Sequence, residues 1–173
     1  FVGLFALAGL AYVHWVLPGK VEASMNIVLP HEAYAVSDEA RALHDSLFVV
    51  DLHSDSLLWN RDLSKESTIG HMDVPRLKAG NVALQVFSAT TKTPSDMNFS
   101  SNTSYSDDIS VLAVASMWPP RTWSSLYERA VYQLDNLYRV AERSELIVIR
   151  NRQDLEELVA SRSKGEPVLG GLY

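Results

Sequence analysis

Four short apolar segments alternate along the chain with segments that carry helix signals, and this order limits the fold more than any other feature. The apolar segments are residues 47–52, 81–89, 146–149 and 167–173, and the helical segments between them are residues 74–80, 122–143 and 151–162. Such alternation is typical of a parallel sheet whose strands are joined by crossover helices. Four strands fit either a small open α/β sheet or the first half of a (β/α)8 barrel, which needs eight strands and about 250 residues.

Polar residues mark the ends of several helices. Ser37, Asp73 and Asn151 are each placed to cap a helix, and the helices that we expect after them are residues 37–46, 74–80 and 151–162. Gly80 is suited to end the second of these. Residues 90–108 are rich in Ser, Thr, Asn and Asp, which predicts a long surface loop.

The strongest helix signal covers residues 122–143. Apolar residues recur there at steps of three and four, which predicts one apolar face packed on the core. The members of this stripe are Trp123, Leu126, Tyr127, Ala130, Val131, Leu134, Leu137, Tyr138 and Ala141. We interpret Tyr127 and Tyr138 as core residues and not as part of a cofactor site.

The N-terminal segment has a different character from the rest of the chain. Residues 1–17 (FVGLFALAGLAYVHWVL) contain His14 as their single ionisable side chain, and Pro18-Gly19-Lys20 follows as the expected helix end. This length is at the lower limit for a membrane-spanning helix of about 17–25 residues. A cleaved signal peptide, with a cleavage site near residues 21–23, and a buried core helix are the alternatives.

These patterns divide the chain into three parts: a membrane anchor or signal segment (1–17), a linker (18–36) and an α/β domain (37–173). An anchor and a signal both place the domain outside the cytoplasm, in the periplasm if the source is bacterial. We expect the membrane to be a partner through the first part. The formal net charge of −6 argues against nucleic acid as a partner, since binding phosphates requires a surplus of Lys and Arg.

Three ionisable residues follow the first apolar segment, at Asp51, His53 and Asp55. The segment is β-branched and typical of a strand buried on both faces. Because residues two apart on a strand share a face, the side chains of His53 and Asp55 can converge on one metal ion. Asp51 is a candidate to hold the imidazole of His53 in one tautomer. The chain has no cysteine, so any metal must be held by His and carboxylates. The alternative is a histidine at a strand end with a carboxylate nearby.

Three sequence blocks around these residues resemble the membrane (renal) dipeptidase family of metallopeptidases, and its bacterial branch most of all. They are residues 49–63 (VVDLHSDSLLWNRDL), 70–80 (GHMDVPRLKAG) and 82–88 (VALQVFS), in the order and at the spacing of the family. The resemblance extends from about Glu39 to Tyr173. It implies a (β/α)8 barrel of the amidohydrolase type, of which this chain would form the N-terminal half.

The resemblance also implies a site with two zinc ions and dipeptides as substrates. His53 and Asp55 match the two ligands that the first strand of the family supplies to one zinc. The family's bridging Glu follows a strand that aligns with residues 165–173 (GEPVLGGLY), so this Glu and two later histidines are expected beyond Tyr173. The catalytic residues proper are therefore unassigned, and we expect the 173-residue chain alone to be inactive. The resemblance is also compatible with a homodimer.

Other residues have less specific interpretations. Trp59 is a candidate for the pocket wall, and a core role is equally compatible with its position. His71 is expected to pack or hydrogen-bond in a loop, and His14, His31 and His44 are not expected to bind metal. The alternative functions are another amidohydrolase-type enzyme that acts on amides or lactams, and a catalytically inactive, membrane-tethered remnant.

Overall fold

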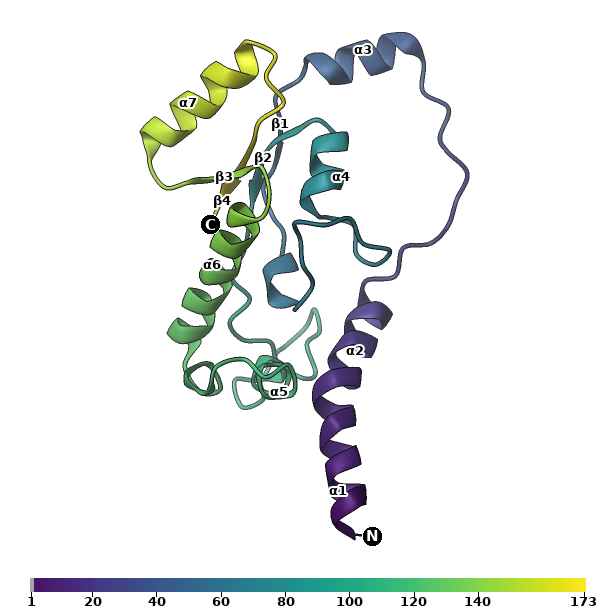
Figure 1. Ribbon diagram of the computed structural model, residues 1–173, viewed down its shortest axis with the longest axis vertical. Helices are drawn as coiled ribbons and strands as arrows, with labels where there is room; N and C mark the ends of the chain where they lie inside the picture. Colours follow the sequence, from purple (N-terminus) through teal and green to yellow (C-terminus); the bar gives the residue numbers. More distant parts are fainter. Residues whose placement is uncertain (1) are drawn as a thin grey trace.

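The computed structural model describes residues 2–173, and it shows a mixed α/β chain with an apolar helix at its N-terminus (Figure 1). Its strands are β1 (Val49–Asp51), β2 (Val82–Val86), β3 (Leu146–Ile149) and β4 (Leu169–Leu172). The α-helices are α1 (Val2–Ala11), α2 (Leu17–Met25), α3 (Asp38–Ser46), α4 (Val74–Ala79), α5 (Asp108–Ala115), α6 (Leu126–Glu142) and α7 (Arg152–Ser163). Three short turns of other helix types are η1 (Tyr12–Val16), η2 (Ser56–Leu58) and η3 (Pro120–Thr122).

The four strands form one parallel sheet in the order β1-β2-β4-β3. The expected α/β class and parallel sheet are confirmed. The register pairs Leu84 of β2 with Gly170 of β4, and Ile147 of β3 with the same glycine. The strands of a (β/α)8 barrel follow one another in chain order. Here β4 lies between β2 and β3, so this sheet differs from a run of consecutive barrel strands.

Helices cover both faces of the sheet, and two adjacent glycines of β4 show how. A Cβ atom added at Gly170 would lie 2.6 Å from a methyl carbon of Leu158, which belongs to α7. A Cβ atom added at Gly171 would instead meet Leu146 and Phe87, which belong to the core cluster that includes Leu137 of α6. Because adjacent strand residues point to opposite faces, α6 and α7 lie on opposite sides of the sheet. Gly170 thus lets α7 approach the strand closely, and Gly171 leaves room for Leu146 and Phe87 on the opposite face.

The first strand is shorter and less buried than its sequence predicts. β1 has three residues, lies at the edge of the sheet and leaves Val50 and Asp51 exposed. The expectation of a strand buried on both faces is therefore wrong for β1. The physical reason is the strand order, because the inner places go to β2 and β4 and β1 pairs with one strand, β2.

The predicted helix caps are confirmed. The side chains of Ser37, Asp73 and Asn151 each accept a hydrogen bond from the backbone N–H three residues later, at 3.0–3.2 Å. These bonds satisfy donors that the first turn of a helix leaves without a partner. The first helical residues are Asp38, Val74 and Arg152, and Gly80 follows the last residue of α4.

The face that the longest helix buries agrees with the predicted stripe only toward its C-terminal end, where Leu137 is buried and Ala141 packs against the core. The buried residues of α6 are Arg129, Gln133, Leu137 and Val140. Tyr127 is 74% exposed and Tyr138 is 40% exposed, so the expectation that both are core residues is wrong. Arg129 and Gln133 are polar, and they are buried because hydrogen bonds to the preceding loop compensate for the loss of water.

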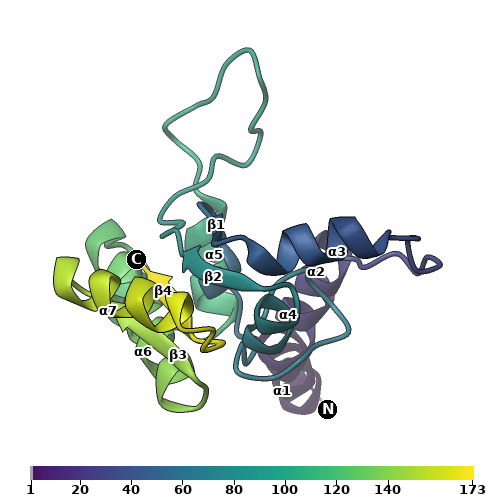
Figure 2. The ribbon, with the colours of Figure 1, turned by 90° about the horizontal axis from the view of Figure 1, so that it is seen from above.

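Arg129 joins the long loop to α5 and α6. Its guanidinium is 1% exposed, and it donates to the carboxylate of Asp107 at 2.6 Å and to the hydroxyl of Ser110 at 2.7 Å. Backbone carbonyls of Thr91, Thr122 and Trp123 accept its remaining hydrogen bonds. Figure 2 shows the segment between β2 and α5 extending away from the rest of the molecule, with both of its ends near this arginine. The predicted loop is confirmed, and Arg129 fixes its base.

The N-terminal helix continues past Pro18, where the sequence predicted its end. The turn η1 is a π-helical turn in which the N–H of Leu17 donates to the carbonyl of Tyr12, five residues earlier. Proline lacks an N–H, and its ring clashes with the carbonyl four residues before it. The wider π turn makes room for the ring, and α2 then runs to Met25. The predicted stop at Pro18 is therefore wrong, and the segment without helix or strand is limited to residues 26–37.

Residues Gly3–Met25 form a continuous helix that is long and apolar enough to cross a membrane, and no residue in its most apolar stretch is buried. Its C-terminal part is nevertheless attached to the domain. The carboxylate of Glu22 accepts from Nε of Arg61 at 3.0 Å, and both side chains are 8% exposed. The carbonyl of Asn26 accepts from the N–H of Gly70 at 2.7 Å. The N-terminal helix and the domain are thus one packed unit at this end.

Candidate metal centre

The candidate site lies where β1 and β2 end. His53 and Asp55 follow β1, and Ser88 and Thr90 follow β2, its neighbour in the sheet. The N–H of Ser88 donates to the carbonyl of Ser54 at 2.9 Å, which holds the two segments together beyond the last strand residues. The carboxyl ends of parallel strands meet at one edge of a sheet, and ligands of α/β proteins bind at this edge.

The structure brings the side chains of His53 and Asp55 together. Nε2 of His53 lies 3.2 Å from Oδ2 of Asp55. Two atoms that each lie about 2.1 Å from one tetrahedral zinc are roughly 3.4 Å apart, so this separation fits two ligands of one ion. The side chains are 71% and 48% exposed, respectively, so both are open to solvent and to further ligands.

Side chains from the segment after β2 hold both of these residues. Oγ of Ser88 lies 2.9 Å from Nδ1 of His53, and the hydroxyl of Thr90 donates to Oδ1 of Asp55 at 2.9 Å. Each candidate ligand therefore has one atom held by this segment and another directed at the other candidate. Metal-binding histidines ordinarily have their second ring nitrogen hydrogen-bonded in this way. Sequence reasoning missed Ser88 and Thr90, although the parallel pairing of the two strands was a signal that could have found them.

Asp51 occupies a different place from the one expected for it. Its Oδ1 accepts a hydrogen bond from the backbone N–H of His53 at 3.1 Å. The imidazole contacts Ser88 instead. Asp51 thus shapes the backbone turn after β1, and Ser88 is the residue that orients the ring.

The described residues bring together two candidate metal ligands and no third at this place. Among residues 2–173, no three His, Asp or Glu side chains come together in a way that could hold a metal ion. His71 is exposed in the loop before α4, and His44 lies beside Asp45 on α3. His14 and His31 hydrogen-bond to backbone carbonyls, those of Ala115 and Glu32. The site is therefore a pair, where a catalytic zinc ordinarily has three protein ligands.

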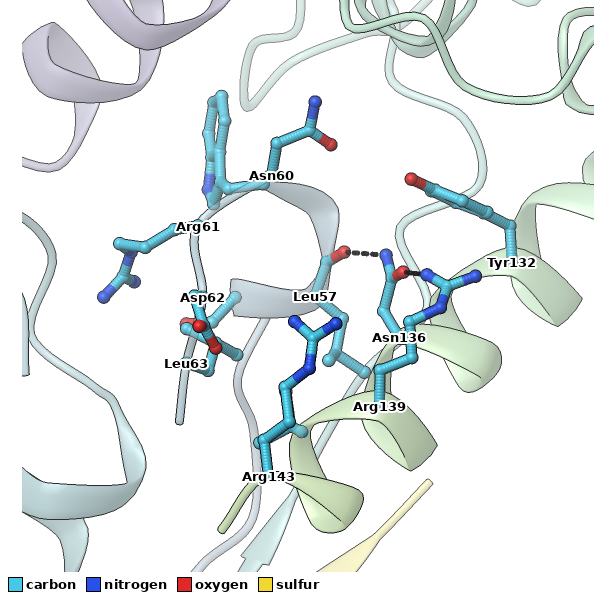
Figure 3. A pocket seen from close by; sticks show the side chains of 12 residues that line it. Leu57, Asn60, Arg61, Asp62, Leu63, Tyr132, Asn136, Arg139 and Arg143 are labelled. Atoms are coloured by element: carbon cyan, nitrogen blue, oxygen red, sulfur yellow. Dashed lines mark hydrogen bonds between the residues drawn. The ribbon is translucent and has the colours of Figure 1, made fainter. Parts of the chain in front are cut away.

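Trp59 lies beyond the turn η2, where it lines a cavity of about 260 Å³ (Figure 3). The cavity is bounded by η2 and the segment after it on one side and by α6 on the other. Asn136 of α6 lines it, donating to the carbonyl of Leu57 at 3.5 Å and accepting from Arg139. Three arginines and one carboxylate line it: Arg61, Arg139, Arg143 and Asp62. The hydroxyl of Ser64 donates to Asp62 and holds its pKa below the usual range, which keeps this carboxylate charged.

Comparison of the chain with models of protein families, with curated proteins and with solved structures found no match. Membership of the dipeptidase family, which the three sequence blocks suggest, therefore stays a proposal.

Proposed function

We propose that this chain carries the first zinc half-site of a membrane-anchored dipeptidase, with His53 and Asp55 as its ligands. The observation that supports the proposal is the 3.2 Å separation of Nε2 of His53 and Oδ2 of Asp55 at the carboxyl end of β1. It agrees with the His-x-Asp position of the membrane dipeptidase family, to which we propose the chain belongs. The substrates would be dipeptides, and the domain would lie outside the cytoplasm.

The residues of the half-site have distinct roles in this proposal. His53 would bind zinc through Nε2, because Ser88 occupies the side of Nδ1. Asp55 would bind through Oδ2, because Thr90 donates to Oδ1. A bound zinc lowers the pKa of its water to about 7 and thereby supplies hydroxide for peptide hydrolysis. A second zinc and its ligands, among them a bridging Glu, are implied by the resemblance and are not supplied by the described residues.

We also propose the more specific fold that the resemblance implies, a (β/α)8 barrel. Support for it comes from the parallel strands, from the crossover helices and from the position of the half-site at the carboxyl ends of strands. A barrel in chain order requires β3 to lie between β2 and β4. The order β1-β2-β4-β3 favours an open sheet with helices on both faces, so the neighbours of β2 distinguish the two architectures.

Metal binding tests the half-site directly. We expect the purified chain to bind Co²⁺ with a visible absorption spectrum that Zn²⁺ abolishes, and His53→Ala and Asp55→Ala each to weaken binding at least about ten-fold. His71→Ala is the matched control, because His71 is exposed and lies in the loop before α4. Equal affinities for the wild type and for His53→Ala would refute the assignment of the ligands.

Activity tests the reaction. Amino acids released from a panel of dipeptides are measured with the complete gene product, in the presence of zinc and after treatment with a chelator. We expect zinc-dependent release that is lost in His53→Ala. Cleavage of amides or lactams without release of amino acids from any dipeptide would favour the amidohydrolase alternative and refute the dipeptidase.

A second candidate is a membrane-tethered protein without catalytic activity. The observation that favours it is the absence, among residues 2–173, of a third ligand near His53 and Asp55. Metal analysis separates the two candidates, because two tightly bound zinc ions per chain would refute this one. Failure of the chain to retain any zinc during gel filtration would support it.

A further inference from the structure

The helix α5 is apolar around most of its circumference, although it lies at the surface. One side carries Ile109 and Ala113, which are buried with Trp118 in a core cluster. A second side faces α2, where Leu112, Ala115 and the edge of Val111 line an apolar groove together with residues of that helix. A third side remains open. A helix that is apolar all round is ordinarily buried in protein or in a membrane.

The open side of α5 and the turn after it expose three large apolar side chains. Val111 is 69% exposed, Val114 is 39% exposed and Met117 is 53% exposed. Val111 and Val114 are three residues apart on α5 and so follow one another along one side, and Met117 lies in the turn directly after the helix. Met117 also lines an apolar groove of about 500 Å³ against α1, with Leu7, Leu10 and Trp15 on the opposite wall. The apolar surface of α5 is thus continuous with that of the N-terminal helix.

Contacts with the N-terminal helix fix the position of α5 along that helix. Nδ1 of His14 donates to the carbonyl of Ala115 at 3.1 Å, which places the C-terminal end of α5 beside the uncharged part of that helix. The N-terminal end of α5, with Asp108, lies beside Val21 and Met25. This stretch of the N-terminal helix contains its charged residues, Lys20 and Glu22. The ends of α5 therefore lie beside different stretches of the N-terminal helix, one apolar and one charged. Figure 1 shows α5 next to α2.

Contacts between the N-terminal helix and the domain fix the position of α5 relative to that helix. Glu22 holds Arg61 in a buried ion pair, and Asn26 accepts from Gly70. With His14 bound to Ala115, contacts at three positions join the helix and its C-terminal cap to the domain. Inserting the helix into a bilayer therefore carries α5 with it to a set depth.

We propose that α5 and the turn after it form a second membrane contact beside the N-terminal helix, with the side chains of Val111, Val114 and Met117 in the lipid. This inference rests on the proposed membrane anchor and is independent of the proposed dipeptidase activity. The occupant of the open side is the edge of the bilayer hydrocarbon, because the apolar surface continues from α5 onto the anchor helix. Asp107 and Asp108 stay in water at the other end of α5. Such a helix lies in the interface with its apolar side toward the acyl chains.

Spin labels on single cysteines test the proposal, and the chain has no cysteine of its own. The purified full chain is reconstituted into phosphatidylcholine vesicles that contain phosphatidylglycerol, with one label at Val111, Val114 or Met117. Collisions with oxygen, which concentrates in lipid, are compared with collisions with a nickel chelate, which stays in water. A label at Leu7 reports the anchor, and a label at Val159 of α7, which is 43% exposed, is the matched control in water.

We expect oxygen to dominate at Val111, Val114, Met117 and Leu7, and the nickel chelate to dominate at Val159. Nickel collisions at the three α5 sites, with oxygen still dominant at Leu7, would overturn the proposal and leave the anchor intact. Nickel collisions at Leu7 as well would overturn both. Shielding of the α5 sites from both reagents would mean that protein covers this side, and it would also overturn the proposal.

Discussion

Oγ of Ser88 lies 2.9 Å from Nδ1 of His53, so that a residue after β2 orients the imidazole of a residue after β1. Replacing Ser88 by Ala removes this contact and leaves the two candidate ligands in place. Loss of such a partner ordinarily weakens metal binding about 10–100-fold, and we expect a loss in this range for Ser88→Ala in a Co²⁺ titration. Ser88→Thr, which keeps the hydroxyl, should retain most of the affinity. Unchanged affinity in Ser88→Ala would show that the hydroxyl does not support the metal.

A disulfide between β2 and β4 tests the strand order. Val86 and Leu172 are register partners in the sheet. Adjacent strands lie about 4.8 Å apart, within the reach of a disulfide, whereas two strands separated by a third do not meet. We expect the variant with Val86→Cys and Leu172→Cys to form an intramolecular disulfide under mild oxidation, measured by a shift in electrophoretic mobility. Absence of this bond in a folded variant would favour a barrel with β3 between the two strands.

The buried guanidinium of Arg129 should be the costliest side chain of α6 to remove. Replacing it by Met leaves Asp107 and several carbonyls without their donor, and we expect the free energy of unfolding to fall by about 3 kcal/mol or more. Arg139→Met on the exposed side of the same helix is the matched control, expected within about 0.5 kcal/mol of the wild type. Urea unfolding measures both. Similar stabilities of the two variants would contradict the structural role of Arg129.

The stability of the domain should fall at acidic pH because of Asp73 and Asp107. Burial on its own raises the pKa of each carboxyl, but hydrogen bonds outweigh it, from Arg76 to Asp73 and from Arg129 to Asp107, so both pKa values lie below the ordinary 3.8. A carboxyl with a lowered pKa stabilises the fold at pH values above that of the unfolded chain. This contribution is lost as the pH falls through the lower value of the folded state.

We therefore expect the free energy of unfolding to decline below about pH 4. The variant Asp73→Asn should be less stable than the wild type at neutral pH, and the difference should shrink as the acid limit is approached. Urea unfolding across this range measures both effects. A difference that stays constant with pH would mean that the charge of Asp73 does not contribute.

The features that could be predicted from the sequence are those that depend on neighbouring residues in the chain. The caps at Ser37, Asp73 and Asn151 depend only on residues three positions away, and β3 has the predicted bounds because its four apolar residues are flanked by polar ones. The alternation of strands and helices likewise predicts a parallel sheet without knowledge of any long-range contact. These features required no information about which elements pack together.

Features that depend on tertiary packing could not be predicted in the same way. The burial of Arg129 follows from a loop and two helices that meet around it, and periodicity assigned that place to apolar residues. The prediction at Pro18 failed because a π turn can absorb a proline. The sequence analysis did not predict the helix α5, although an Asp at its N-cap is a local signal. The carboxylate of Asp107 accepts a hydrogen bond from the N–H of Ile109. Ser88 and Thr90 became visible only when β1 and β2 were paired.

Because the ion pair of Glu22 with Arg61 holds the N-terminal helix on the domain, the exposed segment 27–37 is not the only link between them, and proteolytic shedding is affected. In a tethered domain, one cut in the stalk frees the domain from its anchor. Here the chain leaves the N-terminal helix, the proposed anchor, after that helix is already packed on the domain, and it continues into α3. A protease that cuts within residues 27–37 would thus produce a nicked protein in which both fragments stay together. Release of the domain from the proposed anchor would require unfolding and not cleavage alone.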